Sequence, residues 1–243
     1  MGGGLGVGPR GRCGAGLRTA AWQTIEDEIH RIVHDCLYGT DFQFIPKGQL
    51  PDLHGKLCTH DGLVVDREGR PYAIIESKVI QKAKHATEKA AKVAREHPDL
   101  KRAHPTLRSS IAVLAGDFTP EPLRMVVASG AEVLFIPQEH LASACLEYGI
   151  EILWKDSQAA AYGTAALGRY NALTPEERKV LGQRILQPVA TRLREAVTDA
   201  IADAPENPIE RVWVDIFFKR GEIGHREFDS IEGALEYLRS WSQ

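Results

Sequence analysis

The sequence predicts an α/β fold in which a mixed central β-sheet is flanked by helices. Three observations predict it. Strand-like apolar runs alternate with helical patterns from residue 21 to residue 158. Two of those runs, Leu63–Val65 and Tyr72–Ile75, are apolar on both faces, which is typical of central strands covered by helices. The chain of 243 residues, 43% hydrophobic and 26% charged, is large and apolar enough to form a substantial core.

The first ordered element is expected to be a helix. Residues 1–20 are glycine-rich, and we expect them to form a disordered tail outside the fold. From residue 21, apolar side chains recur at helical spacing until Tyr38-Gly39 closes the pattern. The segment DFQFIPKGQL then reads as a short strand that runs into a proline-containing loop.

The next elements continue the alternation of strands and helices. The apolar runs Leu63–Val65 and Tyr72–Ile75 are joined by a polar turn and form a hairpin. An alanine- and lysine-rich helix follows and is expected to end before Pro98. After it come the strand SSIAVLAGDF, a helix capped by Thr119, the strand EVLFIP, the helix EHLASACLEYG, and EILW as an edge strand.

The character of the chain changes after residue 158. Residues 159–204 form a helical segment with a break near Pro188, and residues 205–243 form a unit of one β-hairpin and one helix. Asp229 is expected to cap the last helix through a capping box. We therefore divide the chain into a tail (1–20), a core domain (21–158), a helical segment (159–204) and a C-terminal unit (205–243).

Composition excludes several classes of protein. A net charge of only −3 rules out a bulk-basic DNA coat protein, although a local basic groove remains compatible with it. The four cysteines form no CxxC pair that would indicate a zinc or redox site. No apolar run is long enough to span a membrane or to serve as a secretory signal, so we expect a cytoplasmic protein.

Two carboxylates and an ammonium are predicted to meet at one end of the hairpin. If a four-residue loop joins the strands, Val65 faces Tyr72, Leu63 faces Ile74 and Asp61 faces Glu76. Lys78 then lies on the same face as the two acids. Opposed carboxylates repel one another unless a cation lies between them. Oxygen ligands select a hard ion, so this pattern predicts a site for Mg²⁺, for which Mn²⁺ can substitute. The alternative is a purely structural role, a buried salt bridge at the end of the sheet.

The pattern of Asp61, a turn, an apolar strand and then Glu76-Ser77-Lys78 resembles the PD-(D/E)XK nuclease superfamily, which includes many restriction endonucleases. The resemblance covers residues 21–155 and implies a restriction-endonuclease-like core that hydrolyses DNA phosphodiester bonds with Mg²⁺. It implies that Asp61, Glu76 and the backbone carbonyl of Ser77 ligate the metal. It also implies that Lys78 orients or activates the attacking water.

Three further acids stay open as additional site residues. The literal Pro-Asp pair is Pro51-Asp52, whereas His60 precedes Asp61; the register argument favours Asp61, and Asp52 remains the alternative first ligand. Related nucleases often supply an acid from the first helix, so Glu26 and Glu28 are candidates. Solvent-facing helix acids are the competing interpretation for both.

A local excess of basic residues follows the motif. We expect DNA contacts along the helix after the second hairpin strand, from Lys82, Lys84, Lys89 and Lys92. The leading functional expectation is a restriction-type endonuclease that acts on DNA as a homodimer. The alternatives are a repair or recombination nuclease, such as a junction resolvase or an exonuclease, and a non-catalytic DNA-binding protein of the same fold.

Overall fold

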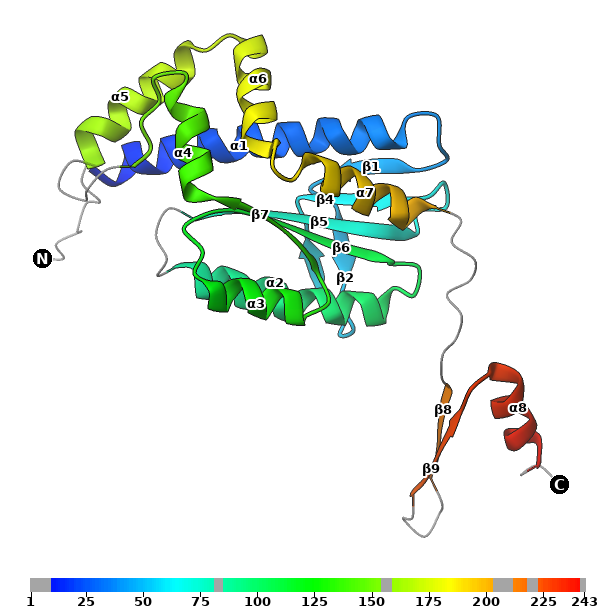
Figure 1. Ribbon diagram of the computed structural model, residues 1–243. Helices are drawn as coiled ribbons and strands as arrows, with labels where there is room; N and C mark the ends of the chain where they lie inside the picture. The colour runs from blue at the N-terminus through cyan, green and yellow to red at the C-terminus, as the bar shows by residue number, and fades with distance from the viewer. Residues whose placement is uncertain (1–9, 81–84, 154–158, 203–211, 218–222, 241–243) are drawn as a thin grey trace, which may run out of the picture. The chain divides into compact units, whose positions relative to one another are not determined.

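The computed structural model describes residues 10–80, 85–153, 159–202, 212–217 and 223–240. The chain divides into two compact units, Met1–Ile201 and Ala202–Gln243. The predicted fold class is confirmed, because a mixed five-stranded sheet lies between layers of helices in the first unit (Figure 1).

The first unit is built from seven helices and seven strands within the described residues. In chain order they are α1 (Arg10–Leu37), β1 (Gln43–Pro46), β2 (Gln49–Pro51), β3 (Leu57–Thr59), β4 (Gly62–Val65), β5 (Pro71–Ile80), α2 (Ala86–Ala103), β6 (Ser109–Gly116), α3 (Pro120–Ala128), β7 (Glu132–Pro137), α4 (Gln138–Leu146), α5 (Ala159–Ala172), α6 (Pro175–Leu186) and α7 (Ala190–Ile201).

The sheet has the strand order β1-β4-β5-β6-β7. β1, β4 and β5 pair antiparallel, whereas β5, β6 and β7 pair parallel. β5 therefore lies at the centre, where the two pairing modes meet. β2 and β3 form a separate two-stranded sheet that the sequence did not lead us to expect.

The β4–β5 hairpin keeps the expected register where it matters for the site. Leu63 lies opposite Ile74, as predicted. A bulge between Val64 and Val65 then places Val65 opposite Pro71, so our expected pairing of Val65 with Tyr72 is wrong. A bulge adds a residue to one strand near the turn and leaves the pairing farther along the hairpin unchanged.

One face of the sheet is covered by α1, α4 and α7 (Figure 1). The predicted apolar stripe of α1 is confirmed, since its members are buried: Ile25, Ile29, Ile32, Val33 and Leu37. α5, α6 and α7 contribute Tyr170, Leu181 and Leu193 to the same core cluster. The helical segment after residue 158 is thus part of the first unit rather than an appendage, because its apolar faces complete this core.

α2 and α3 cover the opposite face (Figure 1). α2 was expected to end before Pro98, but it continues to Ala103 with the proline inside it. A proline inside a helix removes one backbone hydrogen bond. Here His97 and Leu100, which flank the proline, are both buried against the sheet, and this packing maintains the helix through the defect.

The helix boundaries differ from expectation at other places. α1 begins at Arg10, so residues 10–20 are helical rather than part of a disordered tail, while residues 1–9 lie outside the described residues. Once a helix exists, each added residue gains a hydrogen bond at little cost, which favours such extension. Residues 151–153 of the EILW segment form no strand; Ile152 is buried there as a core side chain. The break between α6 and α7 around Pro188 is confirmed.

The second unit contains β8 (Val212–Phe217), β9 (Ile223–Phe228) and α8 (Ile231–Ser240). The strands pair antiparallel, as the sequence predicted. The cap of α8 is Ser230, whose hydroxyl accepts a hydrogen bond from the Gly233 N–H at 3.1 Å, and not Asp229. A serine one residue nearer the helix brings its oxygen within reach of that N–H.

No helix in the described part of the chain combines the length and the apolar character that crossing a bilayer requires.

Candidate active site

The site forms where β5 extends beyond its antiparallel neighbour. β4 starts at Gly62, which pairs with Ile75, while β5 continues to Ile80. At Ser77 a side chain replaces a neighbouring strand as the hydrogen-bond acceptor. Oδ2 of Asp61 accepts hydrogen bonds from the Ser77 N–H at 2.8 Å and from the Ser77 hydroxyl at 3.1 Å. The residue before β4 is thus fixed beside β5.

The ammonium of Lys78 lies among three oxygen atoms. It donates a hydrogen bond to Oε1 of Glu76, and it lies 2.9 Å from the Ser77 carbonyl oxygen and 3.5 Å from Oδ2 of Asp61. The structure therefore brings together Asp61, Glu76 and Lys78.

A second lysine joins the site from the end of β1. Nζ of Lys47 lies 2.5 Å from Oε1 of Glu26 and 2.7 Å from Oδ1 of Asp61. The backbone of Lys47 is left-handed, with a φ of 52°, and its N–H donates to the Asp61 carbonyl at 3.1 Å. The lysine side chain is 52% exposed, so the site meets solvent on this side.

Trp22 of α1 contacts both lysines. Nζ of Lys47 lies 5.3 Å and Nζ of Lys78 lies 5.8 Å from the indole centroid, within the range of cation–π attraction. The indole Nε1 donates to the Ser77 hydroxyl at 3.0 Å. Trp22 and Glu26 are four residues apart on α1, so one face of this helix supplies both side chains.

The lysines set the charge states of the acids. Burial raises the pKa of Asp61, but Lys78, Lys47 and the Ser77 N–H outweigh it and lower this pKa to about 2. Burial also raises the pKa of Glu76, while His60 and Lys78 bring it below its usual value. At Glu26 burial prevails over Lys47, so its pKa is raised. Asp61 and Glu76 are therefore carboxylates at neutral pH, as ligands for a hard cation must be.

The other candidate acids lie in different surroundings. Asp52 accepts hydrogen bonds from the backbone N–H groups of His54 and Lys56, both at 2.9 Å, and so stabilises the β2–β3 turn. Glu28 is buried but pairs with Arg31 on the same helix. Neither carboxylate contacts Asp61, Glu76 or Lys78 in the hydrogen bonds and ion pairs of the described residues, whereas Glu26 reaches the site through Lys47.

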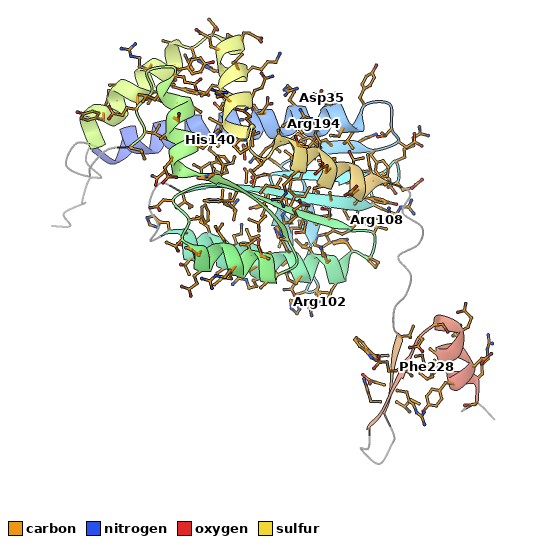
Figure 2. The ribbon with its side chains drawn as sticks, viewed as in Figure 1. Asp35, Arg102, Arg108, His140, Arg194 and Phe228 are labelled. Carbon is orange, nitrogen blue, oxygen red and sulfur yellow. The ribbon has the colours of Figure 1, made fainter. Side chains whose placement is uncertain are left out.

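The basic stretch after β5 is spread along the molecule. Lys82 and Lys84 lie outside the described residues. Lys89 and Lys92 lie in the first half of α2, and Lys92 is 3.7 Å from Glu96. Arg102 lies in the last turn of α2. Arg108 lies near the start of β5 (Figure 2), where its guanidinium stands 5.2 Å from the Tyr72 ring centroid.

The residues present fit a divalent cation. Oε1 of Glu76, the Ser77 carbonyl and Oδ2 of Asp61 already surround one positive charge, the Lys78 ammonium. In the described part of the chain, no three side chains of histidine, cysteine, aspartate or glutamate form a group that would hold a metal ion by themselves. The donor set is instead two carboxylates completed by a backbone carbonyl, which suits an ion that keeps several waters, such as Mg²⁺.

Sequence reasoning missed Lys47 and the role of Trp22. The spacing of Trp22 and Glu26 was a usable signal, because residues four apart share a helix face. Nothing comparable pointed to Lys47, since its position depends on a left-handed backbone at the end of β1. Such a conformation is uncommon for a residue other than glycine.

Comparisons with known proteins give no family. Neither a family model nor a curated protein matches the sequence. A solved structure similar to this chain is the crystal structure of a protein of unknown function, AF1548, at 14% identity and a TM-score of 0.33, covering 73% of this chain and 96% of that chain. A likeness at that level indicates nothing about activity.

Proposed function

We propose that this protein is a metal-dependent deoxyribonuclease, an endonuclease of the restriction type. The observation that carries the proposal is the convergence of Asp61, Glu76 and the Ser77 carbonyl on the single position that the Lys78 ammonium occupies. Three oxygen atoms around one cationic group form a site that can also bind Mg²⁺ or Mn²⁺. The resemblance of the motif to the PD-(D/E)XK superfamily supports DNA as the substrate.

The roles of the residues follow from this geometry. Asp61 and Glu76 would hold the cation through their carboxylates, and the Ser77 carbonyl would add a neutral ligand. When bound, Mg²⁺ supplies polarisation of the scissile phosphate and a lower pKa for water. The Ser77 N–H and hydroxyl hold Oδ2 of Asp61 in place throughout.

Lys78 has a separate task in this proposal. With a divalent cation bound among these oxygens, Lys78 would no longer be needed to balance the two acids, and its ammonium would stabilise the negative charge that develops on the phosphate. Its side chain is 13% exposed, so water screens this interaction little. Loss of Lys78 should therefore reduce the cleavage rate more than the affinity for DNA.

The substrate would approach from the side of Lys47, because the site meets solvent there. Two active sites are needed to cut both strands at one place, so the proposal includes a homodimer that presents one site to each strand.

The test is cleavage of supercoiled plasmid DNA by the purified protein with Mg²⁺, with Mn²⁺, and with a chelator. We expect nicked and linear products with either metal and intact plasmid with the chelator. Glu76→Gln should abolish cleavage. Glu68→Gln, at an exposed acid in the turn of the same hairpin, is the matched control and should cut like the wild type.

The substrates in the assay separate the nuclease classes. Cleavage of a four-way junction but not of plasmid would replace the restriction-type assignment by a resolvase, and digestion only from free ends would replace it by an exonuclease. If plasmid, junction, linear duplex and single strands all survive both metals, the chain is no deoxyribonuclease.

A further inference from the structure

His60 lies behind the carboxylate of Glu76. The consecutive residues His60 and Asp61 lie before β4, and their side chains reach neighbouring residues of β5. Asp61 bonds to Ser77. Nδ1 of His60 lies 3.6 Å from Oε2 of Glu76, the oxygen that does not bond to Lys78. The imidazole is 1% exposed, so it meets neither solvent nor substrate.

Three buried polar atoms at this point make no hydrogen bond within the described residues: both ring nitrogens of His60 and Oε2 of Glu76. Native proteins rarely leave such atoms without a partner, because each loses its hydration without compensation. A leucine in place of His60 would have no ring nitrogens that lose their hydration without compensation. An imidazole at this position therefore calls for an explanation other than packing.

The nearby His97 is not the partner of His60. The two rings are 6.3 Å apart between centroids and lie edge to face. Nδ1 of His97 instead forms a hydrogen bond with the hydroxyl of Ser110 on β6. The carboxylate of Glu76 is thus the group toward which Nδ1 of His60 can donate, and an ionised carboxylate accepts only.

We propose that His60 is a positioning residue for Glu76, with its Nδ1–H donating to Oε2 so that Oε1 is directed at the cation position beside Lys78 and the Ser77 carbonyl. This inference rests on the proposed function. A carboxylate held at one oxygen cannot turn freely about its terminal bond, so the other oxygen stays aimed. Partners of this kind around metal ligands typically change metal affinity by about 10–100-fold when they are removed.

The test compares two substitutions of His60 by calorimetric binding of Mn²⁺ and by thermal melting. His60→Leu fills the space without a donor, whereas His60→Asn places an amide N–H near the position of Nδ1. We expect His60→Leu to bind Mn²⁺ at least about tenfold more weakly. Its melting temperature should change little, because the loss of the Nδ1–H donor to Oε2 is offset by the removal of the ring Nε2, which makes no hydrogen bond within the described residues. His60→Asn should recover most of the Mn²⁺ affinity.

His97→Asn is the matched control, since it alters the other buried imidazole on this face while keeping a group for Ser110. It should leave Mn²⁺ affinity unchanged. If the wild type binds Mn²⁺ and cuts DNA, and folded His60→Leu does both equally well, the role of His60 is overturned alone. If the wild type itself neither binds Mn²⁺ nor cuts DNA, both the proposed function and the positioning role of His60 are wrong.

Discussion

The ammonium of Lys47 lies 2.7 Å from Oδ1 of Asp61, and the same ammonium lies 2.5 Å from Oε1 of Glu26. One lysine at the end of β1 thus separates an acid of α1 from the acid that precedes β4. The arrangement resembles that around Lys78, where a second ammonium lies between Asp61 and Glu76. The acids of this site are compensated by two lysines, and that balance determines how it should respond to substitution.

Lys47→Met should destabilise the protein in the absence of metal. The substitution leaves Glu26 and Asp61 facing each other without a cation, and Glu26 is buried. Because Lys47 itself is half exposed, we expect a loss of only about 1–2 kcal/mol in the free energy of unfolding. Mg²⁺ should restore more stability to this variant than it adds to the wild type, as measured by chemical denaturation with and without the ion.

The control for Lys47→Met is Lys179→Met, which removes an exposed lysine 3.5 Å from Glu176 on α6. Its stability and its response to Mg²⁺ should match the wild type. An equal Mg²⁺ increment in Lys47→Met and the wild type would show that the bound ion does not compensate the charge of Asp61.

Glu26→Gln and Glu28→Gln should differ, although both replace buried acids of α1. Glu26 shares Lys47 with Asp61, whereas Glu28 pairs with Arg31 away from the site. We expect Glu26→Gln to lower the single-turnover cleavage rate about tenfold or more, as outer partners of a metal site do. Glu28→Gln should keep the rate and lose some stability. Equal rates for the two variants would remove Glu26 from the site.

Replacing Lys89 and Lys92 together by alanine should weaken DNA binding through phosphate contacts alone. Each lost contact lowers the slope of log affinity against log salt by about 0.9, so the double variant should lose about two in that slope. Gel-shift titrations from low to moderate salt measure this value, and Mn²⁺ binding should stay unchanged. An unaltered slope would exclude this part of α2 from the DNA interface.

We expect the buried His97 to make the protein less stable in mild acid. Burial lowers its pKa to about 4, against 6.5 when exposed, although the negative charge of Glu76 opposes this and the neighbouring His60, Lys78 and Lys101 add to it. Between these two values the unfolded chain binds a proton that the folded chain does not, so stability falls as pH decreases from 6.5 to 4. The contribution of His97 is about 3 kcal/mol.

Denaturation across that pH range in the wild type and in His97→Asn isolates the contribution of His97, because the other titrating groups are common to both. The variant should lose less stability on acidification. Parallel curves for the two proteins would show that His97 takes up its proton at the same pH in the folded and the unfolded chain.

Much of the hairpin could be predicted from sequence, because alternation of side chains and burial on both faces determine register. Leu63 opposite Ile74 followed from that pattern. The bulge at Val65 did not, since it depends on how the turn closes; there the Asp66 carboxylate accepts hydrogen bonds from two backbone N–H groups of that turn, those of Glu68 and Arg70.

The rest of the site depends on contacts between segments distant in sequence. Lys47 reaches Glu26 across 21 residues and Asp61 across 14, through a left-handed backbone that no local pattern signals. The helix through Pro98 is a similar case, because tertiary burial of the flanking residues overrides a local preference that would end it. Local sequence patterns identify the strands and the acidic residues, whereas tertiary contacts determine which lysines lie between the acids.

The most direct test of the central claim is single-turnover cleavage of plasmid DNA by Asp61→Asn beside Asp52→Asn, with DNA affinity measured by gel shift in parallel. If Asp61, which precedes β4, is a metal ligand, its amide variant should lose at least about a hundredfold in rate while still binding DNA. Asp52→Asn, which alters only the β2–β3 turn, should cut like the wild type. The reverse result, in which Asp61→Asn cuts normally and Asp52→Asn does not, would contradict the account.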